Sequence, residues 1–354
     1  MQSSCVYDFI EGASRVEDGL NLYLDARSRD LCYNMCYTAL LFGEALAMYG
    51  FGKLHPWKTD RIYSFWSKFN VALSKEQRSL LLIEEPELAS EEMLLLFHDK
   101  SYVDLVKRCS KHGTGFLDSG DTPAFKHVFE ASCYVVGSTL KALEIVIKKS
   151  NGIVHAFNPI GGLHHARRDS AGGFCVFNDI GIAILVARKK FGIKRIAYID
   201  IDAHHGDGVY YEFEDDPLLF FADIHENGKF LYPGTGSESE DGIGEAKGTK
   251  LNIPLDPYSG DDAFIKAFNR VEQFIENTAK PELIIMQCGA DSLKGDPITH
   301  LSYTEHCHRY ATDSLHRLAH KYSDGRIIAL GGGGYDATNI GNAWTQVAQA
   351  LIDI

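Results

Sequence analysis

Short apolar, β-rich runs alternate along this chain with longer segments of helical periodicity, and this alternation constrains the fold more than any other feature. The expected strands span residues 152–157, 195–200, 218–223, 283–288 and 326–330. The expected helices span residues 128–148, 178–190, 261–278, 303–320 and 339–352. Such alternation predicts an α/β fold, in which a mostly parallel β-sheet is flanked by helices on both faces.

Four of the expected strands run directly into a polar or glycine-rich segment. These segments begin at Gly161, Asp202, Gly289 and Gly331. Because the carboxyl ends of parallel strands lie at one edge of a sheet, segments spread over more than half of the chain can converge there. We therefore expect a single domain over residues 36–354. The polar cluster at residues 25–30 indicates an N-terminal extension of unassigned role over residues 1–35.

Composition excludes several classes of protein. The chain has 354 residues, of which 45% are hydrophobic, so it is long enough to bury a large core. Its net charge of -13 argues against nucleic-acid binding, which needs a basic face. No apolar run approaches the length of a membrane span, and the first residues lack a secretory pattern. Eight scattered cysteines are typical of a reducing compartment, so we expect a cytoplasmic protein that binds neither nucleic acid nor membrane.

A candidate metal site follows the expected strand at residues 195–200. Asp202 and His204 stand at positions i and i+2, which point the same way on an extended chain. A catalytic zinc ion takes three protein ligands and keeps one position open, and Asp291, at the end of another strand, is the natural third. The alternative is that Asp202 caps a helix and Asp291 opens a turn. Asp-x-His together with a second strand-end aspartate favours a metallohydrolase.

A histidine pair, His164 and His165, follows two glycines at the end of another expected strand. Neighbouring imidazoles can flank a metal-bound water as general base and general acid. Asp200 and Asp207 are the spare carboxylates that can fix the orientation of these rings. The glycine run at residues 331–334 ends in Tyr335, whose phenol can donate to a developing oxyanion, although a core tyrosine on a tight turn would give the same pattern.

A site for two metal ions is the alternative to a site for one. Ureohydrolases that hold two manganese ions use Asp-x-His-x-Asp and a further Asp-x-Asp. Here Gly206 stands at the fifth position of the first motif, and Asp291 is followed by Ser292 and Leu293. Both carboxylates of the second ion are missing, so we predict one ion per chain.

Several motifs together resemble those of the zinc-dependent histone deacetylase family, which has the arginase/deacetylase fold. Within it the chain looks most like the acetoin-utilisation deacetylases of bacteria and archaea. The motifs lie at residues 161–166, 172–175, 200–208, 232–236, 287–291 and 331–335, with His55-Pro56, Arg61 and Asp121-Thr122-Pro123 before them. The resemblance covers about residues 40 to 350.

The resemblance implies a metal site and a role for each residue around it. The implied ligands of one Zn²⁺, with Fe²⁺ as the alternative in the cell, are Asp202, His204 and Asp291. His165 would be the main general base and acid, with His164 as its electrostatic companion. Asp207 and Asp200 would orient these two rings. Tyr335 would polarise the acyl carbonyl.

The resemblance also implies a narrow tunnel for an acyl-lysine stem, lined and rimmed by Asp121, Gly173, Phe174, Tyr232, Ile298 and Gly333. Asp121 at the rim would hydrogen-bond the substrate backbone. Two positions depart from the family pattern. Tyr232 replaces a phenylalanine, which places a hydroxyl beside the stem and predicts a changed acyl preference. Asp223 replaces a serine near a structural monovalent cation, K⁺ by implication, and predicts a stronger or altered cation site.

The leading hypothesis is a zinc-dependent amidohydrolase that removes acetyl or other short acyl groups from lysine side chains of proteins. The same machinery would serve a small-molecule amidohydrolase, for instance one that acts on acetylpolyamines. The acidic chain suits either cationic substrate and does not separate them. A catalytically silent acyl-lysine-binding protein is the third alternative, and the presence of every expected ligand, both histidines and Tyr335 disfavours it.

Overall fold

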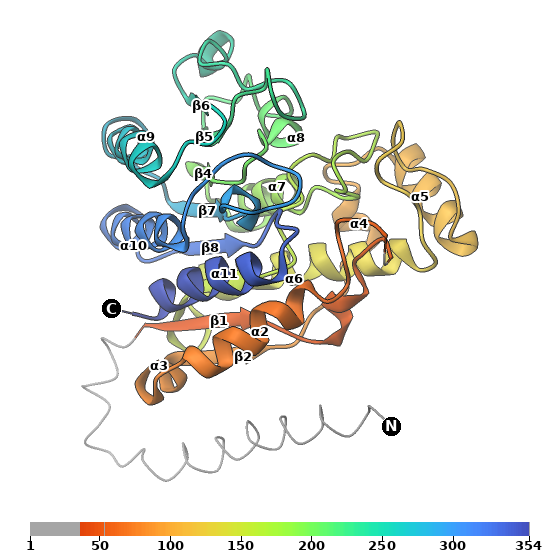
Figure 1. The fold of residues 1–354 in the computed structure, drawn as a ribbon, viewed down its shortest axis with the longest axis horizontal. Coiled ribbons are helices and arrows are strands. Elements are labelled where there is room, and N and C mark those ends of the chain that lie inside the picture. Colours follow the sequence, from red (N-terminus) through yellow and green to blue (C-terminus); the bar gives the residue numbers. More distant parts are fainter. Residues whose placement is uncertain (1–35, 53, 354) are drawn as a thin grey trace. The chain divides into compact units, whose positions relative to one another are not determined.

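The computed structural model describes residues 36–52 and 54–353, so the predicted extension over residues 1–35 lies outside the described residues. Strands of this part form one sheet in the order β2-β1-β3-β8-β7-β4-β5-β6. Every neighbouring pair in it is parallel. The structure thus confirms the α/β class and the predicted sheet (Figure 1). None of the helices described here has the length and apolarity needed to cross a bilayer.

The eight strands include the five that the sequence predicts. Their bounds are β1 Tyr37–Leu41, β2 Leu81–Glu84, β3 Ile153–Asn158, β4 Ile196–Asp200, β5 Leu219–Glu226, β6 Lys250–Leu255, β7 Leu283–Gln287 and β8 Ile327–Leu330. The unpredicted strands β1, β2 and β6 occupy the outer positions of the sheet. Strand β5 continues three residues beyond its expected end at residue 223, through a fully buried segment.

The five predicted helices are also present, with shifts of a few residues at their ends. The helices are α2 Arg61–Ala72, α3 Lys75–Leu80, α4 Glu91–Leu94, α5 Lys100–His112, α6 Val128–Lys148, α7 Asp179–Phe191, α8 Asp207–Tyr210, α9 Asp261–Phe274, α10 Glu305–Tyr322 and α11 Ala337–Ile352. The helix predicted over residues 261–278 changes at Ile275 into a π-helical turn, η5 Ile275–Ala279. Helices α2 to α5 and the short α8 were not predicted.

Helices cover both faces of the sheet. On one face, α6 packs against β1, β3 and β8, and α5 and α7 pack against α6. On the other face, α9, α10 and α11 lie side by side across the strands, and α2 packs against α11 (Figure 1). Every residue of β3, β4 and β7 is buried, as expected for inner strands of a covered parallel sheet.

The strand order explains why the polar segments meet. Strands β3, β8, β7 and β4 are consecutive neighbours in the middle of the sheet. They end at Asn158, Leu330, Gln287 and Asp200, and each end leads into one of the four polar or glycine-rich segments. The predicted convergence at one edge of the sheet is therefore confirmed.

Candidate active site

Asp202, His204 and Asp291 form a compact, buried group with the geometry of a metal site. Their potential ligand atoms all lie within 4.8 Å of one another. His204 Nδ1 lies 3.0 Å from Asp202 Oδ1 and 3.0 Å from Asp291 Oδ2. The first two residues follow β4, and the third lies in a short 3-10 turn, η6 Ala290–Ser292, after β7. Two carboxylates and one imidazole match the donor set of a three-ligand zinc site.

Hydrogen bonds hold the remaining oxygens of these carboxylates. The Ala203 amide donates to Asp291 Oδ1 at 3.0 Å, and the Gly333 amide donates to Asp202 Oδ2 at 2.8 Å. One oxygen of each carboxylate is thereby fixed, and the other faces His204. Burial acts to lower the pKa of His204, but the two carboxylates outweigh it and raise the pKa to about 10. The two carboxylates thus favour a positive charge at this position, which fits a bound cation.

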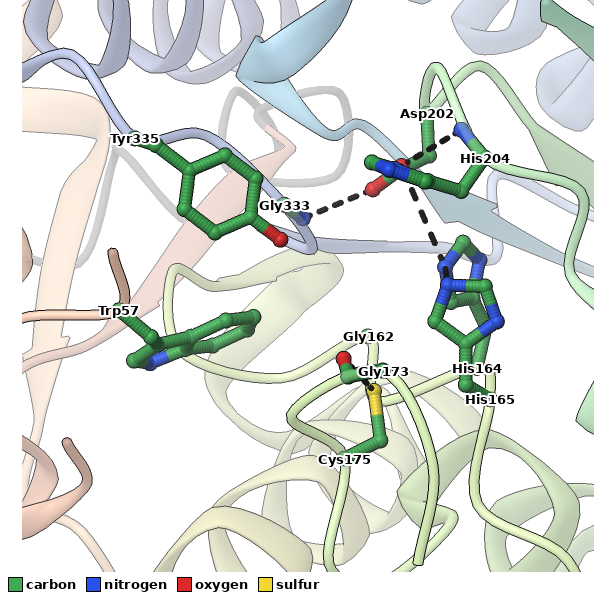
Figure 2. A pocket seen from close by; sticks show the side chains of 10 residues that line it. All are labelled: Trp57, Gly162, His164, His165, Gly173, Cys175, Asp202, His204, Gly333 and Tyr335. Carbon is green, nitrogen blue, oxygen red and sulfur yellow. Dashed lines mark hydrogen bonds and ion pairs between the residues drawn. The ribbon is translucent and has the colours of Figure 1, made fainter. Parts of the chain in front are cut away.

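The His164–His165 pair lies beside this group, as Figure 2 shows. The two Nε2 atoms are 3.0 Å apart, and both rings are buried. Each Nδ1 donates to a carboxylate: His164 to Asp200 Oδ2 at 2.8 Å, and His165 to Asp207 Oδ1 at 2.6 Å. The tautomer is set from the far side of each ring, which turns both Nε2 atoms toward the pocket. The structure thus brings together all four of these residues.

The two histidines differ in charge because their surroundings differ. Burial acts to lower the pKa of His164, but Asp200 and Asp202 outweigh it and raise the pKa to about 9. Burial and the neighbouring charge of His164 lower the pKa of His165 to about 4, against the opposing effect of Asp207. At neutral pH the pair therefore consists of one imidazolium and one neutral imidazole. Shifts in opposite directions are typical of an acid–base pair.

Tyr335 faces the same pocket from the opposite side. Figure 2 shows its hydroxyl pointing past Gly333 toward the metal-binding group. Burial, together with Asp291 and Asp202, raises the pKa of Tyr335 well above its usual value, so the phenol keeps its proton. Buried Arg61 supports this loop by donating to the carbonyl of Gly334 at 3.1 Å. The structure thus places the predicted hydrogen-bond donor at the site.

Position 333 requires a glycine, because the backbone there passes close to the carboxylates of Asp291 and Asp202. A Cβ at this position would lie 2.2 Å from Asp291 Oδ2 and 2.8 Å from Asp202 Oδ2. We therefore expect Gly333→Ala to displace a ligand oxygen, to weaken metal binding, and to reduce amide hydrolysis by at least about 100-fold. Metal content and turnover of the purified variant measure this. Gly260→Ala is the control, because the nearest atom to its Cβ lies 3.6 Å away. Normal metal content in Gly333→Ala would contradict the assignment.

Gly206 leaves no space for a carboxylate that would hold a second ion. A Cβ there would lie 2.7 Å from Asp200 Oδ2. The Gly206 amide donates to Asp223 Oδ2 at 2.8 Å, and the other oxygen of Asp223 lies 2.6 Å from His225 Nδ1. His225 Nε2 donates to the carbonyl of Gly236 at 2.8 Å, so both ring nitrogens face acceptors. Burial acts to lower the pKa of His225, but Asp223 outweighs it and raises the pKa, and the K⁺ site stays a prediction.

Three of the expected tunnel residues surround the histidine pair and the tyrosine. The Tyr232 ring lies 5.0 Å from the His165 ring, and the Phe174 ring lies 5.8 Å from the Tyr335 ring. A Cβ at Gly173 would lie 2.3 Å from His165 Cδ2. Tyr232 is 45% exposed, so it belongs to the open end of the pocket.

The other two predicted tunnel residues, Asp121 and Ile298, lie farther from the pocket. Each is linked by hydrogen bonds to residues closer to it. Exposed Asp121 accepts from the Thr122 hydroxyl at 2.9 Å, and that hydroxyl accepts from the Phe174 amide at 3.1 Å. On the other side, half-buried Ile298 donates its amide to Asp296 Oδ1 at 3.1 Å. These contacts fit a rim and a wall, but neither residue lines the deepest part of the pocket.

Three residues that sequence reasoning assigned no role also belong to the site. Trp57 and Cys175 line the pocket, and Trp57 lies against Tyr335 with ring centroids 6.3 Å apart (Figure 2). Gln287 Nε2 donates to Asp202 Oδ2 at 2.7 Å. Gln287 and Cys175 lie within recognised motifs, which was the available signal. The sequence offered no signal for Trp57 other than its position just after His55-Pro56.

Comparisons with known proteins agree with this arrangement. The histone deacetylase domain matches residues 55–351. The acetoin utilization protein AcuC of Bacillus subtilis (strain 168) is 37% identical over 318 residues, which cover 88% of this chain and 81% of that protein. AcuC of Staphylococcus aureus (strain MSSA476) is 33% identical over 89% of this chain and 82% of its own length.

Solved structures of the same fold are similar as well. The HD domain of HDA15 superposes with a TM-score of 0.81 at 26% identity, covering 90% of both chains. A histone deacetylase homologue in complex with SAHA superposes with a TM-score of 0.76 at 29% identity, covering 90% of this chain and 84% of that one. The domain match, the relatives and the buried site agree, and this chain belongs to the histone deacetylase family.

Proposed function

We propose that this chain is a zinc-dependent deacetylase that removes acetyl or other short acyl groups from lysine side-chain amides of proteins. One observation carries the proposal: two carboxylate-backed imidazoles, with Nε2 atoms 3.0 Å apart, lie beside a buried Asp-His-Asp group. That arrangement provides a base and an acid next to a metal site, which is the machinery of metal-assisted amide hydrolysis.

Asp202, His204 and Asp291 would hold the ion, which we propose is Zn²⁺, with Fe²⁺ as the alternative in the cell. When bound, such an ion supplies Lewis acidity and lowers the pKa of a coordinated water toward about 7. The donor set fits either ion, because imidazole and carboxylate ligands serve both. Elemental analysis of protein purified from its native host would identify the ion.

The protein side chains then move the protons. Neutral His165, oriented by Asp207, takes a proton from the attacking water through Nε2. His164, held as an imidazolium by Asp200, stabilises the negative charge that develops nearby. His165 returns its proton to the amine as that group leaves. The acyl oxygen accepts a hydrogen bond from Tyr335.

Tyr335→Phe should keep its metal and lose most of its activity. The substitution removes one hydrogen-bond donor to the developing oxyanion, which typically costs about 100- to 1000-fold in kcat. Steady-state hydrolysis of an acetyl-lysine peptide, with metal content determined in parallel, measures this. Tyr63→Phe is a suitable control, since Tyr63 lies on α2 with 41% of its surface exposed. Near-normal turnover of Tyr335→Phe would refute the role of the phenol.

The substrate class rests on the shape and charge of the site. Gly173, Phe174 and Tyr232 lie around the histidine pair and Tyr335, and we propose that they line a narrow passage for the stem of an acyl-lysine. The chain carries a net charge of -13, which favours cationic substrates. The similar AcuC proteins are described as acetoin utilization proteins, which is compatible with a protein target and does not name one.

Comparison of an acetyl-lysine peptide with N-acetylspermidine tests the substrate class. We expect a higher kcat/KM on the peptide. A preference for N-acetylspermidine of about 10-fold or more, worth about 1.4 kcal/mol, would instead identify a small-molecule amidohydrolase. Absence of turnover on both, in protein that holds its metal, would favour an acyl-lysine-binding protein.

Tyr232 should influence the choice of acyl group. Its hydroxyl lies close to Gly172, where an added Cβ would be 3.2 Å away, and burial raises its pKa so that it stays protonated. We expect Tyr232→Phe to raise the butyryl-to-acetyl ratio of kcat/KM by up to about 10-fold, because it removes a polar group beside an apolar chain. Competition between the two acyl peptides measures this ratio. An unchanged ratio would contradict the assignment of Tyr232 to the tunnel wall.

We also propose a cytoplasmic location and no nucleic-acid or membrane partner. The negative charge supports the second point. Support for the first comes from five thiols that form no disulfide: Cys109, Cys133, Cys175, Cys288 and Cys307.

A further inference from the structure

Three histidines from β3 and α10 meet away from the candidate active site. His155 lies in β3, and His316 and His320 lie one turn apart near the end of α10. His320 Nε2 lies 3.0 Å from His155 Nε2 and 3.0 Å from His316 Nε2. Ring nitrogens of all three residues lie within 4.8 Å of one another. One nitrogen from each ring thus lies in a group that could hold a metal ion.

The histidine cluster formed by His155, His316 and His320 lies toward the amino edge of the sheet. His155 is the third residue of β3, whereas the candidate active site follows the end of that strand. Helix α10 ends at Tyr322, just before β8 begins at Ile327. The end of α10 therefore lies near the start of β8, away from the carboxyl edge of the sheet. Figure 1 shows α10 next to α11, whose last turn also reaches the cluster.

Hydrogen bonds on the far side of two rings fix their tautomers. His316 Nδ1 lies 2.9 Å from the carbonyl of Ala350, which only accepts, so this nitrogen carries the hydrogen. His155 Nδ1 lies 3.4 Å from Thr38 Oγ1, whose own hydrogen is donated to the carbonyl of Leu351 at 2.8 Å. The threonine oxygen therefore accepts from His155. Both rings turn an Nε2 lone pair toward His320.

Three neutral rings cannot satisfy this arrangement. His320 Nε2 can carry one hydrogen, and one hydrogen cannot fill two contacts of 3.0 Å with good geometry. At least one contact would then place two lone pairs against each other. A cation bound by all three nitrogens removes the conflict. With metal–nitrogen bonds of about 2.0–2.1 Å, a spacing of 3.0 Å corresponds to an angle of roughly 90–100° at the metal.

The surroundings favour the ligand form of these rings. His155 and His316 are buried, and His320 opens the cluster to solvent. Lys149 and Asp324, the two charges that act on His320, pair with each other, and the carboxylates of Asp313 and Asp353 act on His316. Far-side partners such as Ala350 and Thr38 are the kind of support that metal-binding histidines normally have.

We propose that His155, His316 and His320 form a second metal site, which binds one Zn²⁺, or another transition-metal dication that imidazole favours, through three Nε2 atoms. His320 is exposed while His155 is fully buried, so the ion would be reached from solvent at His320 and would keep a position there for water. The bound ion would link α10 to β3, two elements that lie far apart in the sequence, and would stabilise their contact. This site is independent of the proposed deacetylase function.

Metal content tests this site directly. After saturation with Zn²⁺ and removal of loosely bound ion, the wild-type chain should hold two equivalents, one in each site. His320→Ala should hold one fewer, and His316→Ala should repeat the loss. His306→Ala should keep both, because His306 is an exposed histidine on the same helix. Equal zinc content in wild type and His320→Ala would overturn the proposal.

Thermal stability in the absence of the first site separates this proposal from the proposed function. Zn²⁺ should raise the Tm of Asp291→Ala, which lacks a ligand of the candidate active site. It should not raise the Tm of Asp291→Ala combined with His320→Ala, and an equal rise in both would overturn the proposal. His320→Ala alone should still hydrolyse an acetyl-lysine peptide at the wild-type rate. If neither wild type nor any variant hydrolyses the acetyl-lysine peptide, the proposed function is contradicted. The difference in zinc content between wild type and His320→Ala would still support the second metal site.

Discussion

Asp291→Ala should lose one equivalent of zinc and essentially all amide hydrolysis. Asp291 is fully buried, and its Oδ2 lies 3.0 Å from His204 Nδ1. Its other oxygen accepts from the Ala203 amide, so the carboxylate also holds the loop that carries Asp202 and His204. Loss of a residue that only supports a ligand costs about 10- to 100-fold in metal affinity, so loss of a ligand should cost more.

Zinc content and turnover on an acetyl-lysine peptide, both relative to wild type, measure this effect. Asp262→Ala provides the matched control, because Asp262 is an exposed aspartate at the start of α9. It should match wild type in both measurements. An Asp291→Ala protein that binds as much zinc as wild type would contradict the proposed set of metal ligands.

His165→Ala should separate catalysis from metal binding. The ring is not a proposed ligand, so the variant should keep its zinc and its fold. General acid–base catalysis by one side chain contributes about 100- to 10,000-fold, and we expect a loss of kcat in that range. The reason is local: His165 Nε2 faces the pocket while Asp207 holds its Nδ1 at 2.6 Å. Removal of the ring leaves His164 as an imidazolium that cannot accept the proton.

Single-turnover hydrolysis, with zinc content measured on the same sample, distinguishes this outcome from loss of the metal. His306→Ala on the surface of α10 should behave as wild type. Should His165→Ala retain kcat within a few-fold of wild type, the general base would have to be another group.

Most of the site could be predicted because its residues directly follow the carboxyl ends of strands. Asp202, His204 and Asp291 follow apolar runs that are unmistakable in the sequence, and parallel pairing then brings the ends of these runs together. The inner strands are fully buried and therefore read as continuous apolar segments. Local sequence and long-range topology agree at these positions.

The outer strands and the early helices could not be predicted in the same way. Strand β2 is four residues long and only partly buried, and β6 contains Pro254 and Asn252. Such segments carry a weak strand signal, since edge strands need less apolar surface. Trp57 lies just before α2 and Arg61 is the first residue of α2, a helix that packs against α11. That contact joins distant parts of the chain and leaves no local pattern.

Two other features depend on partners that the sequence analysis did not recognise. The extra charge of Asp223 was expected to change a cation site, yet its partner is His225, two residues later on the same face of β5. That spacing was a usable signal. The histidine cluster joins β3 to α10, and each of its members alone resembles an ordinary core or surface histidine.

Metal dependence of deacetylation tests the central claim most directly. The purified chain would be stripped with a chelator, its zinc content verified, and its hydrolysis of an acetyl-lysine peptide measured before and after Zn²⁺ is added back. We predict that stripping abolishes hydrolysis and that Zn²⁺ restores it in wild type but not in Asp291→Ala. Hydrolysis at the untreated rate by protein shown to be free of metal would contradict the account.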